Sequence, residues 1–287
     1  RLRPARAAKA AASVAALAMI MAGVWRMAGP AAGVGLAALV AVSNNWFAKG
    51  PILTAEPVVY GPFFLMWAFM AGKLKPRGRW FWAGAMWGLA YMTKGTALAA
   101  LAALPVAWAA WALVRRRSAD AAPLRKSWRP LAIAAAGFVA GAVVCAWPLL
   151  ARNAVRFGNP LSNLASDVMW LDSWAEHVPL YEDPDAPRPT PWSYLRTHSA
   201  AQIARRAVFG LRMQTPRLLG GVASDPAFGR PVWAATLALS AALVVLGLAA
   251  AARERASWAG VFTLCLTGVG FALFVWYAYI SYASRFV

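Results

Sequence analysis

The stretch "WFWAGAMWGLAYMTKGTALAALAALPVAWAAWALV", residues 80–114, decides how many times this chain can cross a membrane. As a single α-helix it would be about 50 Å long, because an α-helix rises about 1.5 Å per residue, whereas the hydrocarbon core of a bilayer is about 30 Å thick. Lys94 and Gly95 interrupt the apolar residues near its middle. We therefore predict a break at 93–96 between two helices, 80–94 and 96–114.

The composition indicates that the rest of the chain is also membrane-embedded. The 287 residues are 61% hydrophobic and 14% charged, and they include 16 tryptophans. Apolar runs long enough to cross a bilayer recur along the sequence. The predicted fold class is an all-α, polytopic integral membrane helical bundle of about eight transmembrane helices. The six spans besides the two above are expected near 10–27, 31–48, 57–72, 131–151, 232–251 and 258–283.

The positive charge follows the loops. A net charge of +19 could suggest a nucleic-acid partner, but the cations form short clusters between apolar runs. Basic loops of membrane proteins are retained in the cytoplasm, and dividing residues 80–114 into two helices puts 73–79, 115–129 and 253–255 on one side. We expect a multi-pass protein of the cytoplasmic (inner) membrane, with its active face outward, membrane lipids as partners and no nucleic acid.

Residues 152–230 differ from the apolar regions 1–151 and 231–287 on either side. They contain seven of the ten acidic residues and nine basic ones, so the segment is nearly neutral. We expect an outward-facing, extracytoplasmic loop domain here. Within it, residues 192–213 place Leu195, Ile203, Val208 and Leu211 among Arg196, Arg205, Arg206 and Arg212, which predicts an amphipathic helix lying along the membrane surface.

In this topology the loop 43–56 and the break at 93–96 also face outward. Glu56 is the one acidic residue before Asp120. A carboxylate at the membrane boundary is costly unless it is paired, hydrated or used, but it would also stabilise the N-terminus of helix 57–72. Lys94 could meet an anionic headgroup or phosphate, or simply extend its amine to the interface.

Two arginines are further candidates on the same side. Arg152 and Asn153 close the span 131–151 just before the turn Gly158-Asn159-Pro160, and Arg285 follows an aromatic helix end. A planar guanidinium suits bidentate contact with a phosphate. The alternative for both arginines is an interfacial anchor in a belt of aromatic residues.

Other kinds of site find little support. His177 and His198 have neither ligand-like spacing nor thiolate partners, and Cys145 and Cys265 lie in apolar runs. We predict no metal site and no bound cofactor, leaving the use of a divalent metal open. The small residues of "GAMWG", 84–88, are expected to serve helix packing.

Four segments carry a family resemblance. "LTAEPVVYGPFFLMWAFMAG" (53–72), "WFWAGAMWGLAYMTKGTALAALAALP" (80–105), "WPLLARNAVRFGNPL" (147–161) and "YASRFV" (282–287) resemble the family 39 membrane glycosyltransferases of GT-C fold. That family includes the aminoarabinose transferases of lipid A and the protein O-mannosyltransferases. "GLAYMTKGT" and "RNAVRFGNP" are its most specific parts.

The resemblance implies a function. These enzymes take a sugar from a polyprenyl-phosphate carrier and pass it to a lipid, protein or glycan acceptor on the outer side of the membrane. Because the leaving group of such a transfer is a lipid phosphate on which negative charge builds, we expect Lys94, Arg152 and Arg285 to bind the carrier phosphate, with Asn153 helping to orient. Glu56, the catalytic candidate, is expected to bind the sugar or the acceptor.

The sequence also departs from the family. Its members carry an acidic residue, the presumed general base, in the first outward loop, and this sequence starts where the second helix of the family would. We therefore expect a chain truncated at both ends. Two other functions stay open: a lipid-linked sugar flippase or transporter, for which inverted repeats would be expected, and a catalytically incomplete membrane scaffold.

Overall fold

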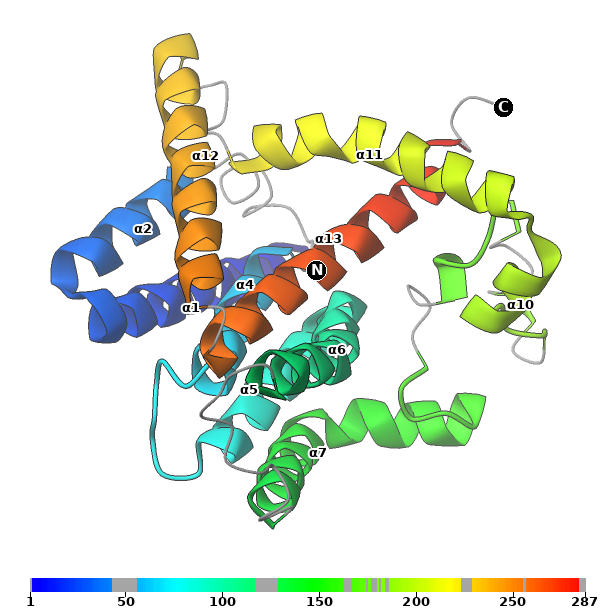
Figure 1. The fold of residues 1–287 in the computed structure, drawn as a ribbon, viewed down its shortest axis with the longest axis horizontal. Helices are drawn as coiled ribbons and strands as arrows, with labels where there is room; N and C mark the ends of the chain where they lie inside the picture. The colour runs from blue at the N-terminus through cyan, green and yellow to red at the C-terminus, as the bar shows by residue number, and fades with distance from the viewer. Residues whose placement is uncertain are drawn as a thin grey trace. The chain divides into compact units, whose positions relative to one another are not determined.

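The computed structural model describes residues 2–42, 56–116, 129–162, 167–173, 175–176, 180, 182–183, 186–222, 229–254 and 257–283. All regular elements in these ranges are helices, which confirms the predicted all-α class (Figure 1). They are α1 (Leu2–Ala28), α2 (Pro30–Val42), α4 (Glu56–Met70), α5 (Arg79–Thr93), the short 3-10 helix η1 (Gly95–Ala97), α6 (Leu98–Arg116), α7 (Arg129–Phe157), α10 (Pro191–Thr197), α11 (Ala200–Val222), α12 (Arg230–Arg253) and α13 (Trp258–Ala283).

Within the described ranges, five helices are long and apolar enough to cross a membrane, which indicates a helical membrane protein. They cover Ala7–Ala28, Gly95–Val114, Ala132–Phe157, Arg230–Arg253 and Trp258–Ile280. On α12, Val244, Val245 and Leu246 are 53–64% exposed, an arrangement that lipid rather than water would cover. Two further apolar helices, at Pro30–Val40 and Val58–Met70, are shorter, and the count of eight spans stays a prediction.

The predicted break between α5 and α6 is confirmed. Helix α5 ends at Thr93, and Lys94 is extended, with φ −156° and ψ 132°. The indole N–H of Trp87 on α5 donates to the carbonyl of Ala97 at 2.9 Å, which ties the turn back to the preceding helix. The apolar stretch 80–114 is therefore two helices joined by η1.

The chain forms two compact units. The first contains residues 1–147 and 219–267, and the second contains residues 148–218 and 268–287. Helices α7, α11 and α13 therefore contribute residues to both. The second unit includes most of the loop domain expected at 152–230 and also takes in the C-terminal part of α13.

Small residues bring the helices of the first unit together. Gly84 and Gly88 on α5 face Gly141 and its neighbours on α7, and a Cβ on Gly88 would lie only 2.9 Å from the carbonyl oxygen of Ala142. A Cβ on Gly84 would overlap the carbonyl of Phe138. Small residues four apart allow two backbones this close, so the packing role expected for residues 84–88 is confirmed.

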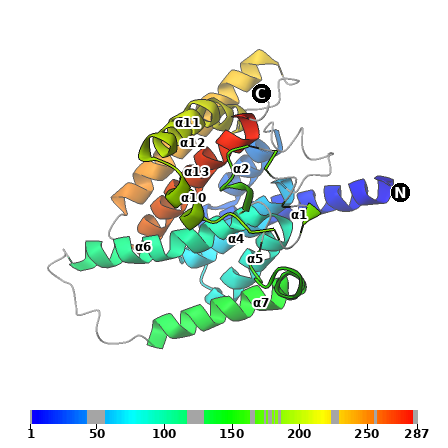
Figure 2. The same cartoon turned by 90° about the vertical axis from the view of Figure 1, so that its right-hand side faces the viewer.

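The basic segments that follow α4 and end α12 lie at the same end of the first unit. Lys73 lies 3.3 Å from the carboxylate of Glu254, and the indole of Trp258 donates to the carbonyl of Met70 at 2.8 Å. Trp111, near the end of α6, meets Trp258 edge to face at 5.9 Å between ring centroids. The C-terminal ends of α4, α6 and α12 therefore lie together (Figure 2). For the described residues of 73–79 and 253–255, this agrees with the prediction that the basic segments share one side.

Helices α4 and α5 form a hairpin, because they pack against each other and are joined by the short connection 71–78. The hairpin puts the start of α4 and the end of α5 at the same end of the first unit, away from the basic segments. Glu56 and Lys94 occupy those two positions.

In the second unit, α10, α11 and the end of α13 surround the segment 167–173. Val168, Leu171 and Leu180 pack against Ile280 of α13 in a small apolar core. Gly210 of α11 lies so close to the carbonyl of Val275 that a Cβ there would overlap it. The predicted amphipathic helix 192–213 is in fact two helices. The capping box between Thr190 and Ser193 begins α10, and His198 is extended where α10 ends.

Candidate functional site

Arg152 and Asn153 lie side by side near the end of α7. Asn153 is 1% exposed, and its side-chain oxygen accepts hydrogen bonds from Nε and Nη2 of Arg152 at 3.3 and 3.0 Å. Its side-chain nitrogen donates to the carbonyls of Ser162 and Pro160 at 2.7 and 3.4 Å. Asn153 thus joins the turn after α7 to the helix and at the same time orients the guanidinium.

The guanidinium of Arg152 retains capacity for a ligand. Arg152 is exposed, and among the described residues Nη1 has no hydrogen-bond partner. A further arginine follows one turn later: Arg156, also exposed, stands over the ring of Phe157 at 5.6 Å. Arg152 therefore presents positive charge near the end of α7, which suits an anion.

The other predicted site residues are less fully described. Glu56 is the first residue of α4, where a negative charge is favourable, although its side chain lies outside the described part of the structure. Lys94 is partly buried in the turn between α5 and η1. Arg285 lies outside the described residues. The structure therefore brings Arg152 and Asn153 into contact, and it puts Glu56 and Lys94 at one end of the first unit.

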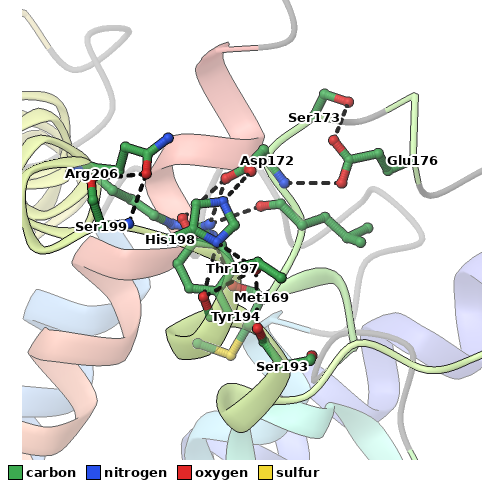
Figure 3. A network of polar contacts seen from close by, with 12 residues as sticks. Met169, Asp172, Ser173, Glu176, Ser193, Tyr194, Thr197, His198, Ser199 and Arg206 are labelled. Atoms are coloured by element: carbon green, nitrogen blue, oxygen red, sulfur yellow. Dashed lines mark hydrogen bonds and ion pairs between the residues drawn. The ribbon is translucent and has the colours of Figure 1, made fainter.

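A polar network around Arg206 was missed by the sequence analysis (Figure 3). Arg206, on α11, is only 1% exposed. Its guanidinium donates to the carbonyls of Met169 and Leu171 at 2.7 and 2.8 Å, and Nε donates to the carbonyl of Trp276 at 3.4 Å. The rings of Trp276, Tyr194 and Tyr279 lie 4.4, 4.9 and 5.3 Å from its Cζ atom.

Asp172 supplies the negative charge of this network. Its Oδ1 lies 3.6 Å from Nη1 of Arg206 and accepts a 3.0 Å hydrogen bond from the hydroxyl of Tyr194. Its Oδ2 lies 2.6 Å from Nε2 of His198. A buried guanidinium is tolerated when it is paired and hydrogen-bonded, and here each of its three nitrogens donates to a carbonyl while Asp172 supplies the opposite charge.

The imidazole of His198 is fully engaged. Nδ1 lies 2.9 Å from the carbonyl of Tyr194 and 3.0 Å from the hydroxyl of Thr197, while Nε2 faces Asp172. The ring also stacks on Tyr194, 3.7 Å away and nearly parallel. Both ring nitrogens have partners within the network, so His198 serves as a structural link between α10 and Asp172.

Tyr194 and Asp172 differ in what they can do. Burial raises the pKa of the Tyr194 phenol above its usual 10.0, against the hydrogen bond and charge of Arg206, which lower it. Tyr194 therefore stays a hydrogen-bond donor. The Asp172 side chain is 43% exposed and can accept further hydroxyl donors.

One pattern in the sequence could have revealed this network. Arg206, Gly210 and Gln214 recur at every fourth residue, and all three are buried on the same side of α11. A row of polar and small residues at helical spacing indicates a packed seam rather than a solvated face. Read alone, however, Arg206 looks like its exposed neighbours Arg205 and Arg212.

No three His, Cys, Asp or Glu side chains lie close enough to hold a metal ion in the part of the chain that is described, and His177 lies outside it. Comparisons with protein-family models, with curated proteins and with solved structures find no match for this chain.

Proposed function

We propose that this protein is a glycosyltransferase that moves a sugar from a polyprenyl-phosphate carrier to an acceptor on the outer side of the cytoplasmic membrane. The observation that carries the proposal is the exposed guanidinium of Arg152, held by the buried amide of Asn153 at the end of a membrane-length helix. Both residues lie in "RNAVRFGNP", one of the two segments that most resemble family 39 enzymes.

The chemistry explains why such an arginine is needed. In the transfer, the bond between the anomeric carbon and a phosphate oxygen breaks, and the lipid phosphate leaves with the electron pair. Negative charge then builds on the phosphate while the anomeric carbon becomes oxocarbenium-like. A guanidinium already oriented by Asn153 stabilises that charge without having to reorganise. The acceptor hydroxyl forms the new bond and loses its proton to a base, which we do not assign.

The remaining candidates take roles in the same reaction. Lys94 and Arg285 are proposed as further phosphate ligands, and Glu56 as a ligand of the sugar or acceptor. Eight spans, with the basic end of the first unit in the cytoplasm, would put Glu56 and Lys94 on the outer side. The clustering of Lys73, Glu254 and Trp258 at the opposite end supports this orientation.

Binding of the carrier tests the phosphate assignment directly. The full chain in nanodiscs would be titrated with a fluorescent polyprenyl phosphate and, as a control, with the matching polyprenol that lacks the phosphate. Arg152→Ala should weaken binding of the phosphate by about tenfold or more, as expected for losing a charge-assisted contact, and leave the polyprenol unaffected. Arg156→Ala, one turn away and also exposed, is the matched control.

Turnover tests the reaction itself. With radiolabelled polyprenyl-phosphate sugars, the wild-type protein should release free carrier in the presence of acceptor, and Arg152→Ala should do so about tenfold more slowly or worse. Equal binding and turnover in Arg152→Ala and Arg156→Ala would refute the phosphate role. Movement of the carrier between leaflets without sugar transfer would favour the transporter interpretation.

A further inference from the structure

The buried side of α11 is defined by three residues. Arg206, Gly210 and Gln214 each contact the backbone of α13: Arg206 donates to the carbonyl of Trp276, Gln214 donates to that of Phe274 at 3.3 Å, and Gly210 touches that of Val275. This seam determines which side of α11 faces its own protein and which side faces away.

The same contacts show how α11 runs relative to α13. From Arg206 to Gln214 a helix advances about 12 Å, whereas residues 274–276 of α13 cover only about 3 Å. The two helices therefore cross instead of running side by side. The crossing lies close to the C-terminal end of the apolar stretch Trp258–Ile280. If α13 spans the bilayer, α11 runs along the membrane plane near one interface, at the level of Trp276 and Tyr279, ring types that concentrate there.

The side of α11 turned away from α13 is exposed and carries both apolar and basic residues. At about 100° per residue, Val208 lies about 160° from the middle of the seam and Leu211 about 100° from it. They are 54% and 43% exposed, and Ala204, one turn before Val208, is exposed as well. Arg205 and Arg212, both exposed, lie along one edge of this stripe. An apolar stripe edged by arginines matches the boundary between acyl chains and phosphate groups.

We propose that α11 lies in the interface of a bilayer containing anionic phospholipid, with Val208 and Leu211 against the acyl chains and Arg205 and Arg212 on lipid phosphates. The occupant is lipid because the stripe combines apolar and cationic groups, and because the crossing puts it at the level where a spanning α13 leaves the membrane. The proposal does not depend on glycosyl transfer.

Depth measurements on the full chain test it. Cys145 and Cys265 would first be replaced by alanine, and single cysteines would then be introduced by Val208→Cys, Glu182→Cys and Val244→Cys and labelled with bimane. Glu182 is an exposed residue in the segment between α7 and α10, and Val244 is an exposed residue in the middle of α12, so they calibrate water and deep lipid. Quenching by iodide reports water, and quenching by spin labels at shallow and deep acyl positions reports lipid.

The label at 208 should be quenched by the shallow lipid probe. It should be protected from iodide, which should quench the label at 182 freely. The deep lipid probe should quench the label at 208 less than the label at 244. In vesicles of phosphatidylcholine with phosphatidylglycerol, Arg205→Gln with Arg212→Gln should raise iodide access to 208 by about twofold or more. Arg156→Gln with Arg196→Gln, which removes the same charge elsewhere, should not.

Two results would overturn the proposal. Free quenching of the 208 label by iodide would show that the stripe faces water. Protection from both iodide and the lipid probes would show that protein covers it, and disulfide-linked dimers of the Val208→Cys protein would identify a second copy as the cover.

Discussion

The packing inside the first unit and the packing inside the second unit rely on different kinds of contact. In the first, helices approach through glycine and alanine, as where Gly84 lies against Phe138, and apolar side chains fill the remaining space. In the second, the central side chain is a charged one: Arg206 is almost fully buried and binds three carbonyl groups and Asp172.

The difference shows what each environment requires. Lipid offers no hydrophobic driving force between apolar helices, so close backbone packing through small residues has to supply their attraction. The segment 167–173 is largely irregular, so helical backbone hydrogen bonds do not satisfy its carbonyl groups, and side chains have to supply the donors. Arg206 supplies them from one side chain, and it links Met169, Leu171 and Trp276 at the same time.

The largest expected effect comes from removing that link. Arg206→Met should destabilise the protein by about 3–5 kcal/mol, because the carbonyl of Leu171 loses its side-chain donor, and the carbonyl of Met169 and the carboxylate of Asp172 each lose one of their partners. Arg205→Met, the exposed neighbour, should change stability by no more than about 0.5 kcal/mol. Unfolding of the full chain in detergent, followed by near-ultraviolet circular dichroism, measures both. Similar losses in the two variants would show that the second unit is not organised around Arg206.

The matching experiment in the first unit uses a single methyl group. Gly84→Ala should cost about 1–3 kcal/mol, because its Cβ meets the Phe138 backbone and the helices must separate. Gly247→Ala on α12 has open space around it and should be neutral or stabilise by up to about 1 kcal/mol through helix propensity. Equal melting temperatures for the two variants would argue against close packing of α5 on α7.

A double-mutant cycle separates the hydrogen bonds of His198 from its stacking. His198→Phe keeps an aromatic ring beside Tyr194 but loses the contact with Asp172, and Asp172→Asn removes the charge. We expect the two substitutions to be coupled by about 1–2 kcal/mol, as for a charge-assisted hydrogen bond. Additive losses in the same unfolding assay would mean that the 2.6 Å contact contributes nothing.

The smallest effect concerns the proton of Tyr194. Because burial raises its pKa above 10.0, the folded protein holds this proton more tightly than the unfolded chain does. The resulting stability is complete below pH 10 and is lost as the pH rises through the raised pKa of the folded state. Tyr194→Phe should therefore lose less stability than wild type between neutral pH and the region above pH 10. Parallel curves for the two proteins would contradict this.

Much of the fold could be predicted from the sequence. The apolar runs predicted the positions of the long helices, although α1 begins eight residues before the predicted 10 and α7 ends six residues after the predicted 151, and Lys94 marked the break between α5 and α6. The charge clusters predicted that residues 73–79 and 253–255 share one end, as the contact of Lys73 with Glu254 shows. These features depend on chain length and on local polarity, which a sequence displays directly.

The candidate site was harder to predict. Arg152 and Asn153 were singled out, but their hydrogen bonds to each other and to the turn at 160–162 could not be foreseen. The network of Asp172, Tyr194, His198 and Arg206 was missed, because its members are far apart in the sequence and three of them occur in a segment that looks like a simple amphipathic helix. Contacts of this kind depend on which elements meet in space.

The sequence by itself determined that the chain is helical, that it belongs in a membrane and where its helices turn, since these follow from how apolar and basic residues alternate along the chain. Only the tertiary structure decided which arginine of α11 is buried and which are exposed. All the arginines have the same intrinsic preference for water. Arg206 is buried because the carbonyl groups of Met169, Leu171 and Trp276 and the carboxylate of Asp172 together replace its hydration, and that set exists only in the folded second unit.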